Sequence, residues 1–151
     1  EQALRALAEA VAATGAVPLV HLCVAAPPVD LLVRSGFRAL SLDATLLTRA
    51  EDDPIAEAVE AGTALLLGLV PTGGPLPEGP DAGRDVAAAA RALWNRTGLE
   101  SDRLGSVAVT PTCGLAGAAP DYARAALQLG RAAARTLVTD PEDVGREESR
   151  G

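Results

Sequence analysis

Two cysteines and the single histidine are the residues of this chain best suited to binding a metal ion. His21 and Cys23 stand two residues apart in an apolar run, and Cys113 stands in the run Thr-Pro-Thr-Cys-Gly-Leu at residues 110–115. Thiolates and imidazole are ligands that zinc prefers, and an oxygen of Asp43 would complete a tetrahedral set. If that carboxylate were displaced, a substrate thiol could enter the fourth position and lose its proton.

Other interpretations of these residues stay open. Two cysteines can be inert buried thiols or a disulfide, a lone histidine is often a structural residue, and an aspartate at a strand end often caps the next helix. The N-terminal segment does not resemble a signal peptide, and no apolar run is long enough to cross a bilayer. We therefore expect a cytoplasmic protein, in which metal binding or catalysis is a better use of cysteine than a disulfide.

Apolar runs of strand length alternate with helical segments along the chain. Strands are predicted at residues 17–24, 39–43, 64–70 and 106–110. Helices are predicted at residues 2–14, 84–97 and 122–138, with two shorter helices that end at Gly36 and Gly62 and a Pro- and Gly-rich loop at residues 71–83. Strand followed by helix, four times over, predicts a parallel sheet with right-handed crossovers.

The fold class is therefore α/β, built of parallel (βα) units, with strands in the order 1-2-3-4 if they form part of a barrel. An open doubly wound sheet is the alternative. No strand is followed by the dinucleotide fingerprint, and the glycines of the 71–83 loop lack the Lys-Ser/Thr of a phosphate loop. All four candidate ligands lie at or just after the carboxyl ends of strands, where α/β proteins place their sites.

Composition supports one packed domain. The chain has 151 residues, of which 48% are hydrophobic and 22% charged, and its formal net charge of −7 argues against binding nucleic acid. We expect the half-barrel to occupy residues 1–139 and residues 140–151 to form a charged flexible tail.

Three segments resemble the catalytic barrel of cobalamin-independent methionine synthase. They are His-Leu-Cys at residues 21–23, Leu-Ser-Leu-Asp at residues 40–43 and Pro-Thr-Cys-Gly-Leu at residues 111–115. In that family a His-x-Cys pair, a strand-end glutamate and the cysteine of Pro-x-Cys-Gly-Leu bind a catalytic zinc that receives the thiol of homocysteine for methylation. The resemblance, over about residues 17–138, implies Zn²⁺ bound by His21, Cys23, Asp43 and Cys113 in the second half of a TIM (β/α)8 barrel.

The chain departs from the family pattern at three points. Asp43 replaces the usual glutamate. The family's histidine after the next strand has no counterpart in residues 69–74, so the methyl donor can be methylfolate or a corrinoid. A complete barrel needs about 250 residues. We therefore expect a fragment or half, inactive alone, whose open edge strands pair with the missing first half or a second copy. Methylation of another thiol and a non-catalytic zinc-binding half-barrel are the alternatives.

Overall fold

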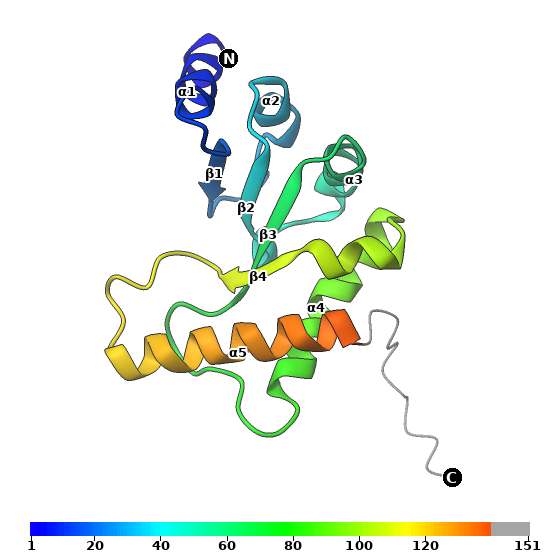
Figure 1. Ribbon diagram of the computed structural model, residues 1–151. Coiled ribbons are helices and arrows are strands. Elements are labelled where there is room, and N and C mark those ends of the chain that lie inside the picture. Colours follow the sequence, from blue (N-terminus) through cyan, green and yellow to red (C-terminus); the bar gives the residue numbers. More distant parts are fainter. Residues whose placement is uncertain (140–151) are drawn as a thin grey trace.

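Four parallel strands form one sheet in the computed structural model, which describes residues 1–139. The strands are β1 (Leu19–Leu22), β2 (Ala39–Asp43), β3 (Ala64–Val70) and β4 (Ala108–Pro111). The helices are α1 (Gln2–Ala12), α2 (Val29–Arg34), α3 (Asp52–Glu60), α4 (Ala82–Thr97) and α5 (Pro120–Thr139), with short 3-10 turns η1 (Ala44–Leu46), η2 (Arg49–Glu51) and η3 (Ser101–Ser106). Figure 1 shows strands and helices alternating along the chain.

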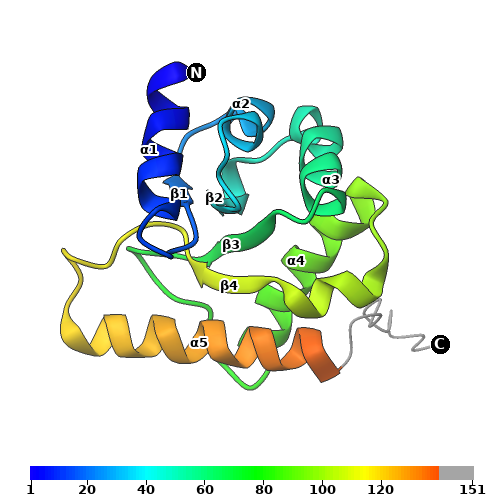
Figure 2. The same ribbon diagram turned by 45° about the horizontal axis from the view of Figure 1, so that its top comes forward.

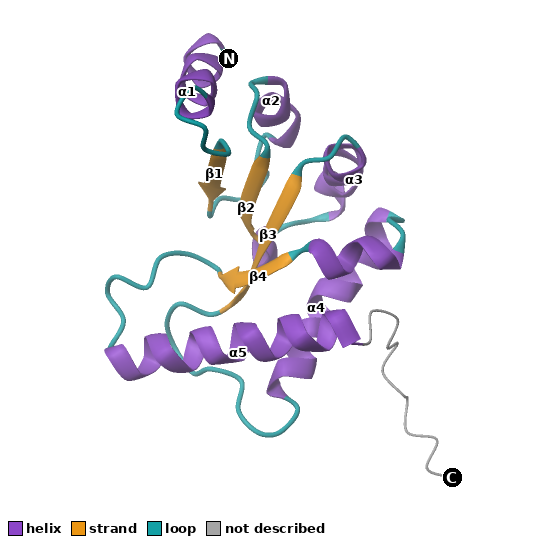
Figure 3. Ribbon diagram, in the orientation of Figure 1, coloured by secondary structure: helices purple, strands orange, loops and turns teal. Residues whose placement is uncertain are grey.

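The strand order is β1-β2-β3-β4, and each strand is hydrogen-bonded in parallel to its neighbour in the sequence (Figure 3). This confirms the predicted α/β fold class, because neighbours in sequence are also neighbours in space, as in a barrel. The register places His21 opposite Ser41 and Asp43 opposite Gly68. The four units therefore form part of a TIM barrel.

The two faces of the sheet differ in what they carry. Leu40, Leu42 and Leu67 are fully buried and belong to the hydrophobic core that the sheet shares with the helices. Side chains alternate between the faces along a strand, so His21 and Ser41 lie on the opposite face. In Figure 2 the helices lie along the outer side of the strands, and α4 and α5 pack against each other. The face with His21 is the one that would line the inside of a barrel.

The observed element bounds correct several predicted ones. The first strand spans four residues, Leu19–Leu22, rather than 17–24. It begins after Pro18, because proline has no N–H to donate to a neighbouring strand, and it ends before Cys23. The fourth strand begins at Ala108, because Ser106 belongs to η3, where its hydroxyl donates to the carbonyl of Arg103. α4 begins at Ala82, inside the segment predicted as a loop. The predicted charged tail at residues 140–151 lies outside the described residues.

Polar contacts tie α3 to α4 and tie α5 to the end of β3. The guanidinium of Arg96 on α4 donates two hydrogen bonds to the carboxylate of Asp52 on α3, at 3.1 and 2.9 Å. The hydroxyl of Tyr122 on α5 donates to the carbonyl of Pro71 after β3, at 3.0 Å. Within residues 1–139, no helix is both long and apolar enough to span a membrane.

Candidate metal centre

The side chains of His21, Cys23 and Cys113 converge at the carboxyl ends of the strands. One ligand atom from each lies within 4.8 Å of the other two, and all three residues are exposed. The two sulfur atoms lie 3.5 Å apart. Two thiolates on one tetrahedral zinc, with Zn–S bonds of about 2.3 Å, stand about 3.8 Å apart. The donor types and their spacing therefore fit zinc.

Both cysteines are free and exposed, so neither of the two alternatives, inert buried thiols or a disulfide, is present in the structure. The alternative of inert buried thiols is wrong, because neither sulfur is enclosed by the core. The Cys23 Sγ and Cys113 Sγ are in hydrogen-bond contact and are not joined by a disulfide. The pair is accessible to a metal ion or to a reagent from solvent.

The Cys113 side chain modifies the acidity of Cys23. The pKa of the Cys23 thiol is raised above its ordinary value, first by the hydrogen bond with Cys113 and then by the charge of that neighbour, with a smaller effect from Asp43. A proton between the two sulfurs relieves the repulsion of two nearby thiolates. A bound cation would serve the same purpose, so metal binding and proton binding compete here.

His21 reaches the site from β1 and is held from β2. Its ring Nδ1 lies 2.9 Å from the hydroxyl oxygen of Ser41, the residue opposite it in the sheet. Ser41 is buried. With Nδ1 engaged in this way, the ring nitrogen left for a metal is Nε2.

Cys113 reaches the site from the far side of the sheet, because β4 is separated from β1 by two strands. The chain leaves β4 by passing over β3, where the amide of Thr112 donates to the carbonyl of Val70 at 2.9 Å. A Cβ on Gly68 would stand 2.8 Å from the Cα of Thr112. Gly68 therefore leaves the space through which this segment brings Cys113 to Cys23. The sequence analysis missed Gly68, although a glycine inside a strand indicates a close backbone approach.

Asp43 lies outside the group of three donors. Its Oδ1 accepts hydrogen bonds from the amide and the hydroxyl of Thr45, at 3.0 and 2.6 Å, and so caps η1. The capping role considered from the sequence is therefore present. The role of Asp43 as a fourth ligand stays a prediction.

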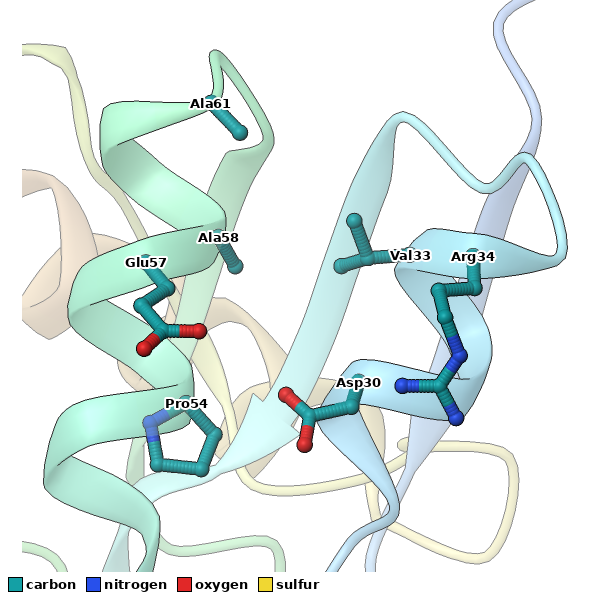
Figure 4. Close-up of a pocket in the computed structure, with 7 residues that line it drawn as sticks. All are labelled: Asp30, Val33, Arg34, Pro54, Glu57, Ala58 and Ala61. Carbon is teal, nitrogen blue, oxygen red and sulfur yellow. The ribbon is translucent and has the colours of Figure 1, made fainter.

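A hollow of about 340 Å³ lies apart from these donors, between α2 and α3 (Figure 4). The carboxylates of Asp30 and Glu57 face it from opposite walls, with Arg34 at its margin. It lies among the helices and includes none of the three donors, so it is not part of the candidate centre.

Parallel βα units in barrel order, with an imidazole and two thiols at their carboxyl ends, define a barrel-type α/β protein with a candidate metal centre. The family model described as cobalamin-independent synthase, catalytic domain, matches residues 2–136. The chain belongs to this family, and it represents a methyltransferase of the methionine synthase type. Comparison with curated proteins and with solved structures gave no match.

Proposed function

We propose that this chain supplies the zinc site of a methyltransferase that converts homocysteine to methionine. The observation that carries the proposal is the convergence of His21, Cys23 and Cys113 to within 4.8 Å at the strand ends of a chain of this family. Bound there, zinc supplies a Lewis acid that keeps a substrate thiol deprotonated at neutral pH. The substrate sulfur in that state is the nucleophile for the methyl group.

The residues of the chain have distinct roles in this proposal. The thiolates of Cys23 and Cys113 offset the charge of the metal, and His21 binds it as a neutral imidazole through Nε2. Asp43 is the proposed fourth ligand and the one that yields its place to the substrate, because a carboxylate oxygen binds zinc less tightly than a thiolate does. Its hydrogen bonds to Thr45 give the carboxylate a position to occupy once it is displaced.

The partners of the site are further parts of the proposal. The methyl group comes from methylfolate or a corrinoid, and the lack of a histidine in residues 69–74 leaves these two donors as rivals. β1 and β4 are the edges of the four-stranded sheet. On the would-be inner face at one edge, Leu19 is 47% exposed. Pairing with four further strands, from a first half-barrel or a second copy, would cover this surface and satisfy the edge amides.

The first test is the metal content of protein purified without chelator. We expect about one zinc per chain. Cys113→Ala should lose most of the zinc, whereas Asp43→Ala should keep much of it. Asp53→Ala is the matched control, since Asp53 is an exposed carboxylate in the first turn of α3. A folded, metal-free protein would contradict the proposal.

The second test concerns the substrate and uses a barrel completed by its other half. Zinc-edge X-ray absorption with saturating homocysteine should show a sulfur ligand gained and an oxygen ligand lost. An unchanged coordination shell would favour a structural zinc site closed by four protein ligands. Turnover assays with methylfolate and with a methylcorrinoid then distinguish the two donors.

A further inference from the structure

The hydroxyl of Ser41 is hydrogen-bonded to the ring of His21. Ser41 lies in the middle of β2 between Leu40 and Leu42, and it is 8% exposed. A buried hydroxyl costs free energy unless it is hydrogen-bonded. The His21 Nδ1, at 2.9 Å, satisfies it. The contact is built into the sheet, because parallel register places residues 21 and 41 side by side.

The direction of this hydrogen bond decides what the imidazole can do. A neutral imidazole carries one hydrogen, on either Nδ1 or Nε2. If Nδ1–H donates to the Ser41 oxygen, Nε2 keeps a free lone pair for a metal. If the Ser41 hydroxyl donates instead, the hydrogen is on Nε2 and must leave before that nitrogen can bind.

We propose that Ser41 is a positioning residue of the metal centre, whose Oγ accepts a hydrogen bond from Nδ1–H of His21. The contact fixes both the tautomer and the plane of the ring, so that Nε2 keeps its lone pair for a metal shared with Cys23 and Cys113. Partners of this kind on the second nitrogen of a metal-binding histidine typically change metal affinity ten- to a hundredfold. The effect on zinc rests on the proposed function, whereas the tautomer is a property of the metal-free chain.

The tautomer can be observed directly, because His21 is the single histidine of the chain. Long-range ¹H–¹⁵N spectra of the metal-free protein, at an alkaline pH where histidine side chains are neutral, distinguish the two ring nitrogens. We expect the Nδ1–H form in the wild-type protein and loss of that preference in Ser41→Ala. A wild-type ring that is mainly Nε2–H would overturn the proposal. The deciding spectrum, that of the wild-type protein, needs neither a variant nor zinc.

Zinc competition against a chromophoric chelator supplies the second readout. Ser41→Ala should weaken zinc binding about ten- to a hundredfold, and Ser41→Thr, which keeps a hydroxyl, should restore most of it. Ser106→Ala is the matched control, since its hydroxyl contacts a backbone carbonyl in η3, and it should bind zinc as the wild type does. Equal affinity of Ser41→Ala and wild type, with both folded by circular dichroism, would refute the positioning role. If the wild type binds no zinc but shows the Nδ1–H tautomer, the zinc function fails while the Ser41 contact stands.

Discussion

The sulfur atoms of Cys23 and Cys113 lie 3.5 Å apart although 90 positions separate the two residues in the chain. Cys23 directly follows β1, and Cys113 follows β4 by two residues. The first and last strands of the sheet thus contribute to one centre. Their approach depends on the segment that passes over β3 at Gly68.

Oxidation of the metal-free protein should join the two cysteines. Their sulfurs need to move from 3.5 Å to the S–S bond length of about 2.05 Å, and both are exposed. We expect a mild thiol oxidant such as diamide to form the Cys23–Cys113 disulfide, with the loss of two hydrogens by mass spectrometry. Saturating zinc should slow the reaction. A product dominated by disulfides between chains would contradict the observed arrangement.

Gly68→Ala should displace the segment that carries Cys113. The new methyl group would meet the Cα of Thr112 at 2.8 Å, and backbone cannot yield as a flexible side chain can. We expect a loss of about 1–3 kcal/mol in the free energy of unfolding by urea and at least about tenfold weaker zinc binding by the folded variant. Gly73→Ala is the control, because nothing lies within 4 Å of its added Cβ. If Gly68→Ala binds zinc as tightly as the control, Gly68 is not needed to place Cys113.

Zinc affinity should rise with pH across the neutral range. The raised pKa of Cys23 means that its thiol keeps a proton to higher pH, and zinc must displace that proton to bind. Each displaced proton contributes about a tenfold gain in affinity per pH unit while the thiol is still protonated. Competition titrations at several pH values measure the slope, and a flat profile would contradict competition between zinc and protons.

The cause of the raised Cys23 pKa has its own check. Cys113→Ala removes both the hydrogen bond and the charge of the neighbour, which are the two largest causes. In this variant Cys23 is the single cysteine. The pH midpoint for its alkylation, measured by peptide mass spectrometry, should therefore be lower than the midpoint for Cys23 in the wild type. An unchanged midpoint would mean that a group other than Cys113 raises the pKa of Cys23.

The ion pair between α3 and α4 should stabilise the fold without affecting the metal centre. In the Arg96–Asp52 pair the side chains are 34% and 11% exposed, and Asp52 holds the pKa of Arg96 above its ordinary value. Arg96→Ala should cost about 1–3 kcal/mol in urea unfolding. Arg124→Ala is the control, since its pair with Asp121 is exposed and its loss should cost less than about 0.5 kcal/mol. Equal effects would show that the α3–α4 pair is as weak as a surface pair.

Much of the fold follows from local patterns in the sequence. The strand at residues 64–70 is predicted with its observed bounds, because a continuous apolar run is flanked by Gly62 and Pro71. The first strand was predicted too long. Val17 and Val24 continue the apolar run, yet they are 65% and 51% exposed outside the strand. Hydrophobicity indicates that a strand exists, whereas backbone pairing decides where it ends.

The candidate site was predictable only where strand ends determine it. The convergence of His21, Cys23 and Cys113 follows from placing all three at the carboxyl ends of parallel strands. The Asp43–Thr45 hydrogen bonds are a local alternative to metal binding, and the sequence alone could not decide between the two. The role of Ser41 could not be predicted, because its contact with His21 depends on the register between two strands.

The wide separation of Cys23 and Cys113 in the chain has a thermodynamic consequence. A metal held by both sulfurs would act as a removable cross-link that closes a long loop of the polypeptide. The complete set of donors exists only in the folded chain. Zinc binding would therefore stabilise the native state by about 2.7 kcal/mol when free zinc is at about a hundred times its dissociation constant. The melting temperature of this protein would then report the free zinc concentration around it.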